Sequence, residues 1–289
     1  RLGIARDRAE ARSLEACPRP QAATPCAAPH HSTPQDSARA KIALAYHERT
    51  KHRPERYAAG PETLDWTSQP DPFRRFQGSP LVRLPLAAGR LARADTQTAT
   101  AFSLDAIGAL LELSLGLSAW KEYGPDRWAL RCNPSSGNLH PTEAYLIAHG
   151  VAGLDDGLYH YASRSHALEQ RCLSRANHPP GLWIGLTSIH WREAWKYGER
   201  AFRYCQHDVG HALAAIAYAA AALGWRARRL DDWGDDQIPA LTGIDRPADF
   251  TGAEPEAPAA VLWIGHGAPP RARDVLAALA DAPWQGRAN

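Results

Sequence analysis

A polar turn that runs directly into an apolar segment, at residues 131–150, constrains the fold of this chain more than any other feature. Two prolines bracket the turn, because Pro134 fixes its own φ and Pro141 cannot continue a helical turn begun after it. The segment Ala144–Ala148 is apolar and is soon followed by a glycine, which predicts a buried strand leaving the loop. We therefore expect a core built around this strand, with the polar loop at its edge.

The loop carries small polar groups that suit a ligand. The Ser135 and Ser136 hydroxyls can cap backbone amides or bind a ligand, and Gly137 allows close approach to the backbone. The Asn138 carboxamide offers both donors and an acceptor. Together these groups fit the edge of a flat heterocycle or a sugar-phosphate chain. The alternative is an ordinary turn rich in Pro, Ser, Asn and Gly, with a structural role only.

Composition excludes several classes of protein. The chain has 289 residues, of which 44% are hydrophobic and 22% charged, enough for a sizeable core. A formal charge of +2 argues against a dedicated nucleic-acid or anionic-membrane surface. The five cysteines are odd in number and include no Cys-x-x-Cys pair, so neither a disulfide framework nor a zinc ribbon is indicated. Because no apolar run reaches the roughly 20 residues of a bilayer span and no signal segment is apparent, we expect a cytoplasmic protein.

Three regions are expected along the chain. Residues 1–40 combine prolines and alanines with scattered charges, which predicts a disordered tail. Residues 41–100 begin with a short helix that ends before Pro54 and continue as an irregular, aromatic-rich and proline-rich N-terminal arm. Such arms often clasp a partner subunit. Residues 101–289 are expected to form the compact domain.

Periodicity within this domain predicts an α+β fold. Ser103 is a natural N-cap for a first helix, and 153–157 should close a hairpin onto a partly exposed strand. Short apolar runs at 182–186 and 261–264 predict two further strands. Between them, residues 202–223 carry apolar side chains at helical spacing and form the longest expected helix. Strands separated by helices are typical of an α+β domain.

Two other patterns have weaker functional readings. His207 and His211 stand four residues apart on the long helix, the spacing of two metal ligands, but no third ligand is evident. We expect one packed and one exposed histidine, and no metal. Residues 191–204 interleave aromatic and basic side chains, which suits a flat ligand or a peptide. Glu193 and Glu199 dilute the positive charge that single-stranded nucleic acid would require.

Two motifs resemble a known family. The loop Pro134–Pro141 resembles the one with which nitroreductase-superfamily proteins hold the ring and ribityl side of FMN. The stretch Trp195–Tyr204, followed by Asp208–His211 and an alanine-rich helix, is similar to the SagB-type branch. That branch includes the thiazoline and oxazoline dehydrogenases of peptide natural-product pathways. The resemblance covers roughly residues 100–267, and it implies a nitroreductase-like mixed central sheet flanked by helices, with FMN at a homodimer interface.

The resemblance also implies roles for individual residues. It assigns FMN contacts in the loop to Pro134, Ser135, Ser136 and Asn138. It assigns proton abstraction to Lys196 and Tyr197, which is chemically sensible because a nearby cation lowers the pKa of a phenol and stabilises its phenolate. Since adjacent residues do not face each other on a helix, this coupling needs an irregular turn, which Gly198 permits. The alternative is a surface lysine beside a core tyrosine.

The residues that would bind the FMN phosphate depart from the pattern of the family. Nitroreductases usually carry a cluster of arginines near the start of the domain, and no such cluster precedes Ser103. Arg131, directly before the loop, and Arg271 or Arg273, after the turn at residues 265–267, are the candidates. If none serves, flavin binding itself is in question.

The function implied by the SagB-type resemblance is FMN-dependent oxidation of peptide azolines to azoles, with oxygen reoxidising the reduced flavin. One alternative is an NAD(P)H-dependent nitroarene or quinone reductase. Another, favoured by the missing arginine cluster, is a non-catalytic peptide-binding partner subunit of a modification complex. The adjacent Lys196 and Tyr197 favour the dehydrogenase.

Overall fold

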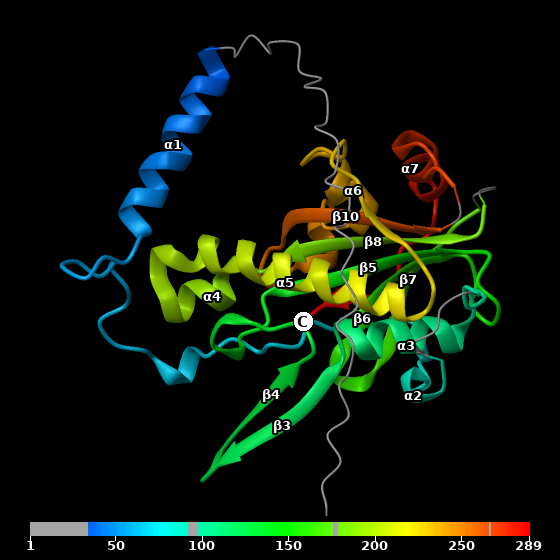
Figure 1. The fold of residues 1–289 in the computed structure, drawn as a ribbon, viewed down its shortest axis with the longest axis horizontal. Helices are drawn as coiled ribbons and strands as arrows, with labels where there is room; N and C mark the ends of the chain where they lie inside the picture. Colours follow the sequence, from blue (N-terminus) through cyan, green and yellow to red (C-terminus); the bar gives the residue numbers. More distant parts are fainter. Residues whose placement is uncertain (1–33, 92–97, 176–178, 266) are drawn as a thin grey trace, which may run out of the picture. The chain divides into compact units, whose positions relative to one another are not determined.

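The computed structural model describes residues 34–91, 98–175, 179–265 and 267–289 (Figure 1). The chain divides into two units, residues 1–49 and 50–289. Helix α1 (Pro34–Thr50) ends before Pro54, as predicted, but begins earlier than expected. The helix thus takes in residues 34–40 of the predicted tail, and residues 1–33 lie outside the described part. Pro34 suits the first position of a helix, and the alanines and long charged side chains that follow favour one without an apolar face.

A seven-stranded sheet forms the middle of the second unit, in the order β2-β7-β6-β5-β8-β10-β9. The strand bounds are β2 (Leu81–Arg83), β5 (Thr142–His149), β6 (Gly157–Ala162), β7 (Ala167–Leu173), β8 (Gly181–Ser188), β9 (Ala227–Arg229) and β10 (Ala257–Gly265). Every pairing in this sheet, among the described residues, is antiparallel. The expected mixed sheet is thus corrected to an antiparallel one. Short loops join β5, β6 and β7, and a strand that returns through a short loop pairs antiparallel.

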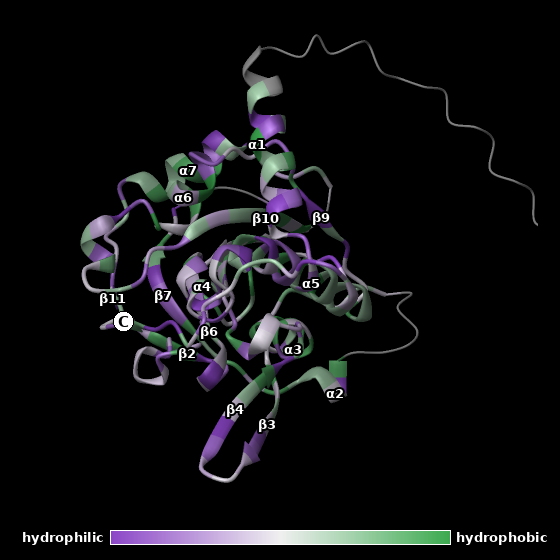
Figure 2. Cartoon of the chain, turned by 90° about the vertical axis from the view of Figure 1, so that its left-hand side faces the viewer, coloured by the Kyte–Doolittle hydropathy of each residue, from purple (hydrophilic) through white to green (hydrophobic). Residues whose placement is uncertain are grey.

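Helices cover both faces of the sheet. They are α3 (Leu104–Ser114), α4 (His190–Tyr197), α5 (Ala201–Ala222), α6 (Gln237–Thr242) and α7 (Ala272–Ala280). Along β5, Leu146 packs in the core cluster with α3 and α5, whereas Ile147 packs in the one with α6 and α7. Helices α3 and α5 carry mostly hydrophobic residues (Figure 2). Because both faces are covered, all residues of β6 are buried, and the expectation of a partly exposed strand there is wrong.

The two main helices of the domain match the sequence patterns. The Ser103 hydroxyl accepts a hydrogen bond from the Ala106 amide at 3.2 Å and caps α3, as predicted. Helix α5 coincides with the predicted long helix to within one residue at each end. No helix in the described part of the chain is long and apolar enough to cross a membrane.

The arm is more ordered than predicted. Strand β2 is an edge strand of the main sheet, and β1 (Phe76–Gln77) pairs with β11 (Arg287–Ala288). The short helix α2 (Ala88–Leu91) also lies in the predicted arm, of which residues 92–97 are outside the described part. The structure places the expected boundary at residue 100 inside the second unit. Strands of two or three residues carry no readable periodicity, so the sequence could not reveal them.

The register of the sheet decides which loops meet. Thr142, the first residue of β5, lies opposite Ser188, the last residue of β8. The loop before β5 and the helix α4 after β8 therefore leave the sheet at the same end. The backbone amide of Ile189 donates to the carbonyl oxygen of Pro141 at 2.8 Å and fastens the two connections together. The hairpin of β3 (Leu117–Tyr123) and β4 (Asp126–Arg131) extends away from the sheet and leads into this loop (Figure 1).

Candidate functional site

The polar loop contains a 3₁₀ turn, η2 (Ser136–Asn138), with unusual backbone angles. Gly137, Asn138 and His140 have φ of +63°, +57° and +49°. Left-handed angles cost a non-glycine residue of order 1–3 kcal/mol, so the surrounding structure must hold them. The Ser135 hydroxyl oxygen contributes by accepting a hydrogen bond from the His140 amide at 2.8 Å. The Ser135 hydroxyl therefore binds a backbone amide of its own loop, one of the two roles expected for it, although it does not cap η2.

Asp208 fixes the loop to helix α5. Its carboxylate accepts hydrogen bonds from the Ser136 amide at 3.1 and 3.2 Å and from the Ser136 hydroxyl at 3.2 Å. Asp208 is only 1% exposed, and burial raises its pKa while the bonds from Ser136 oppose that rise. The Ser136 hydroxyl therefore faces the protein, and its main role in this structure is to hold the loop.

The loop uses most of its amides internally. The Asn138 amide donates to the Ser135 carbonyl at 3.2 Å, and the Leu139 amide donates to the Ser136 carbonyl at 3.4 Å. The Asn138 carboxamide, in contrast, makes no hydrogen bond to any other residue that the structure describes, and it is half-buried. The side chain of Asn138 is thus the loop group best placed to bind a ligand.

Arg192 holds helix α4 against the loop and the sheet. This residue is 1% exposed, and its Nη1 donates to the His140 carbonyl and to Glu143 Oε1, both at 2.6 Å. Glu143 belongs to β5, so one guanidinium group joins the strand, the end of the loop and the helix. At the other side of α4, Trp195 Nε1 donates to the carbonyl of Asp65 in the arm at 3.0 Å. These contacts fix the orientation of the helix that carries Lys196.

The side chains of Lys196 and Tyr197 converge on the loop. A Cβ atom built on Gly137 would lie 2.6 Å from the Tyr197 hydroxyl oxygen and 3.0 Å from Lys196 Nζ. Lys196 Nζ is 5.6 Å from the centroid of the Tyr197 ring. Helix α4 ends at Gly198, whose φ of +54° provides the irregular turn that was expected. The structure therefore brings the two predicted catalytic side chains together and against the predicted cofactor loop.

The electrostatics of Tyr197 differ from the expectation. Burial, followed by the nearby Glu193, Tyr204 and Asp208, raises the pKa of Tyr197 to about 12. The prediction of a lowered phenol pKa is therefore wrong. The physical reason is first the burial of the phenol, and then the negative charge that Glu193 and Asp208 can carry and the Tyr204 phenol, whose ring centroid lies 4.5 Å from that of Tyr197.

Two of the predicted phosphate anchors do not lie together. Arg131 is buried, and its terminal nitrogens donate to the Thr142 carbonyl at 3.1 Å and to the Pro72 carbonyl at 2.9 Å. Arg271 is exposed and follows β10 at the end where Gly265 lies opposite Gly181, away from the loop. Arg131 therefore has a structural role here, and within one chain Arg271 lies at the opposite end of the sheet. Pro134, at the start of the loop, is exposed.

The structure also shows where the histidine pair and the aromatic stretch at residues 191–204 lie. His207 and His211 are both exposed, so the expectation of one packed histidine is wrong. Among the residues that the structure describes, no three metal-binding side chains come together. The aromatic stretch does not form one surface, because Trp191 is 47% exposed whereas Trp195 is buried against Trp66 of the arm.

Sequence reasoning missed the buried charged residues that position the site. Asp208, Arg192 and Glu193 are each at most 1% exposed. A signal for Asp208 was present, because it falls beside Val209 on the apolar stripe of α5, where an unpaired charge is costly. A charge on a buried helical face indicates a partner, here the loop.

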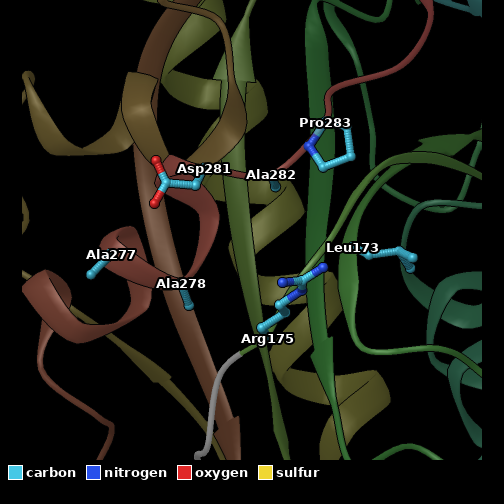
Figure 3. Close-up of a pocket in the computed structure, with 7 residues that line it drawn as sticks. All are labelled: Leu173, Arg175, Ala277, Ala278, Asp281, Ala282 and Pro283. Atoms are coloured by element: carbon cyan, nitrogen blue, oxygen red, sulfur yellow. The ribbon is translucent and has the colours of Figure 1, made fainter.

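A hollow elsewhere on the surface lies apart from this site. It has a volume of about 380 Å³ and is lined by Leu173, Arg175, Asp281, Pro283 and three alanines (Figure 3). Leu173 lies opposite Gly157, and Gly157 lies opposite Ala148 near the far end of β5. None of the predicted site residues lines this hollow.

Two known proteins are similar to this chain in amino-acid sequence. The chain is 26% identical over 130 residues to a "putative nitroreductase" of Methanocaldococcus jannaschii, a match that covers 40% of this chain and 66% of that protein. It is 30% identical over 144 residues to the trifolitoxin-processing protein TfxB of Rhizobium leguminosarum bv. trifolii, covering 42% of this chain and 38% of that protein. The chain thus matches less than two thirds of the length of either relative. No protein-family model matches it.

This chain is also similar in fold to a protein of known crystal structure. A protein from Anabaena variabilis with the same nitroreductase description matches this chain with a TM-score of 0.61 and 28% identity, over 77% of this chain and 46% of that one. The chain therefore has a nitroreductase-like fold, an α+β domain with a large antiparallel sheet and flanking helices.

Proposed function

We propose that this chain is an FMN-dependent oxidoreductase in which Lys196 and Tyr197 manage the proton of the substrate. The observation that supports this most is the convergence of the Tyr197 hydroxyl and the Lys196 ammonium on Gly137. A proton acceptor, a cation and a ligand-binding loop thereby meet in a nitroreductase-like fold. These are the parts that a flavin-dependent dehydrogenase needs besides its cofactor.

The loop residues fit the ring of FMN. The Asn138 carboxamide has donors and an acceptor with no partner in the described part of the chain, which suits the polar edge of a flat heterocycle. Pro134 and Gly137 are exposed, so a flat ligand can approach the loop. When bound, FMN supplies a hydride acceptor.

The phosphate end of FMN requires a further contact. Arg131 is engaged by two carbonyl groups, and Arg271 lies at the opposite end of the sheet. The homodimer expected from the resemblance is therefore part of the proposal, because a second copy can bring an arginine such as Arg271 to the loop. An interface between subunits also agrees with the exposure of the loop.

The proposed substrate is an azoline ring in a peptide, which becomes an azole. Tyr197 takes the proton from the ring carbon as the C–H bond breaks, while the second hydrogen leaves as a hydride. The Lys196 ammonium stabilises the phenolate form of Tyr197 that can accept this proton. Because the pKa of Tyr197 is raised to about 12, only a small fraction of Tyr197 is phenolate at neutral pH, and the proposal relies on Lys196 to stabilise that form. The similarity to a protein named for trifolitoxin processing favours a substrate of the peptide-modification type.

Two other functions have observations in their favour. The similarity to proteins described as nitroreductases favours an NAD(P)H-dependent nitroarene or quinone reductase. The structural use of Arg131 favours a flavin-free, peptide-binding partner subunit, since it removes the nearest phosphate anchor.

One set of measurements separates the three. The purified chain is mixed with FMN, passed over a sizing column, and assayed with an azoline-containing peptide in air and with a nitroarene plus NADPH. The proposal expects a dimer that retains flavin absorbance and removes two hydrogens from each azoline ring. Nitroarene reduction without azoline oxidation would favour the reductase. A protein that retains no flavin would contradict both enzymatic functions.

A further inference from the structure

Helix α4 carries a buried carboxyl group, that of Glu193, on the turn before Lys196 and Tyr197. Glu193 is 0% exposed, and neither of its carboxyl oxygens makes a hydrogen bond with any residue that the structure describes. Native proteins leave few buried polar groups unsatisfied, and each exception calls for an explanation. A buried charge costs more still, so an ionised Glu193 would need a cation beside it.

The position of Glu193 ties it to the proposed site. Lys196 and Tyr197 follow it by three and four residues on helix α4, so the three side chains share one face. From α5, Asp208 and Cys205 face the same carboxyl group. Lys196 acts on this group electrostatically, but among the described residues no ion pair joins Lys196 to Glu193.

The neighbouring carboxyl groups of Asp208 and Glu193 differ in their hydrogen bonds. Asp208 accepts from the amide and the hydroxyl of Ser136, which favours its ionised form. Glu193 accepts no such bonds. Burial, and then the Asp208 carboxylate, raise the pKa of Glu193 to about 9 against the opposing effect of Lys196. At neutral pH the proton therefore belongs to Glu193.

We propose that Glu193 is a positioning residue that stays neutral, so that the Lys196 ammonium acts on the Tyr197 hydroxyl instead of forming an ion pair with Glu193. The inference rests on the proposed function and deepens it, because it explains how a half-buried base can sit beside two carboxyl groups. An ionised Glu193 would attract Lys196 along the helix and would also oppose the formation of a phenolate at Tyr197.

The first test needs neither flavin nor substrate. Tyrosinate absorbance is followed against pH in the wild type and in Glu193→Gln, with Tyr197→Phe versions of each to isolate the contribution of Tyr197. We expect Tyr197 to ionise at a lower pH in Glu193→Gln, by about half a pKa unit or more, because the amide never becomes negative. Infrared spectroscopy at pH 7 should show a protonated carboxyl band that Glu193→Gln lacks and that the control Glu122→Gln, on the exposed hairpin, retains.

The second test uses the loaded enzyme. The ratio of kcat for Glu193→Gln to kcat for the wild type should rise by about threefold or more between pH 8 and pH 10, the fold-change that corresponds to half a pKa unit. Identical ionisation of Tyr197 in both proteins, or an ionised Glu193 at pH 7, would overturn the inference. If both spectroscopic results hold but no azoline is oxidised, the proposed substrate is wrong and the role of Glu193 stands.

Discussion

Asp208 binds both the backbone amide and the side-chain hydroxyl of Ser136, although the two residues are 72 positions apart in the chain. Through this contact helix α5 holds the loop in the backbone conformation that leaves the Asn138 carboxamide available. The same helix contributes Tyr204, whose ring packs on Tyr197. One helix therefore supports both halves of the proposed site.

Replacement of Asp208 should loosen the loop. Asp208→Asn keeps the shape of the side chain but loses the charge-assisted bonds from Ser136, which we expect to cost about 1–3 kcal/mol. Urea unfolding and FMN titration should both show the loss, with weaker flavin binding than in the wild type. Asp232→Asn makes the same change of charge at an exposed position and serves as the control. Equal behaviour of the two variants would show that the contact does not hold the loop.

A comparison of Gly137→Ala with Gly124→Ala should separate the effect of backbone strain from the effect of a clash with the Tyr197 hydroxyl. Both Gly137 (φ +63°) and Gly124 (φ +59°) are left-handed, so alanine at either position should cost about 1–3 kcal/mol. Only at Gly137 would the new Cβ lie 2.6 Å from the Tyr197 hydroxyl oxygen, whereas Gly124 has open space. We expect Gly137→Ala to lower turnover at least tenfold more than Gly124→Ala does, about 1.4 kcal/mol in activation free energy. Equal turnover in the two variants would place the Tyr197 side chain elsewhere in solution.

Replacement of Arg192 by glutamine should strongly lower the free energy of unfolding. Arg192→Gln leaves the buried Glu143 carboxylate without its guanidinium partner, and breaking a buried ion pair in this way costs about 3–5 kcal/mol. The control, Arg90→Gln, removes an exposed ion pair with Asp105, which is worth about 1 kcal/mol or less. Chemical denaturation of both variants measures the difference. A loss for Arg192→Gln no larger than that of Arg90→Gln would mean that the guanidinium does not anchor α4.

The titration of Glu193 predicts how stability depends on pH. Its pKa is raised to about 9 in the folded chain, so its favourable contribution is complete below the ordinary carboxyl pKa and is lost as pH rises toward 9. Glu193→Gln cannot titrate, so its stability relative to the wild type should increase across that range, by at most about 1.4 kcal/mol per pH unit. Thermal unfolding from pH 5 to pH 9 checks this. A constant difference between the two proteins would contradict a buried, neutral Glu193.

Much of the fold could be predicted because local signals agree with the packing. The apolar run that became β5, the Ser103 cap of α3 and the helical spacing along α5 each follow from a few neighbouring residues. The mixed sheet, which only the family resemblance implied, was wrong, because every pairing of the main sheet among the described residues is antiparallel. The short strand β2 was missed because three residues show no period.

The candidate site was predictable in its parts but not in its assembly. The loop and the Lys196-Tyr197 pair could be identified from sequence, whereas their contact depends on Thr142 facing Ser188 across the sheet. Arg131 looked available because it precedes the loop, and only the structure shows the two carbonyl groups that it binds. The raised pKa of Tyr197 also requires tertiary information, since Asp208 comes from another helix.

The most direct measurement of the central claim is azoline oxidation by Tyr197→Phe, per bound flavin, beside the control Tyr204→Phe. Tyr204 packs on Tyr197, but the atoms nearest to a Cβ on Gly137 belong to Tyr197 and Lys196, so the loss of the Tyr204 hydroxyl should affect turnover less. We predict that Tyr197→Phe retains FMN and folding but turns over about 10²-fold or more slowly, the usual scale for removing a general base. Lys196→Ala should do nearly as much, and the double variant should be little worse than either. Wild-type azoline oxidation by Tyr197→Phe, with nitroarene reduction intact, would contradict the account.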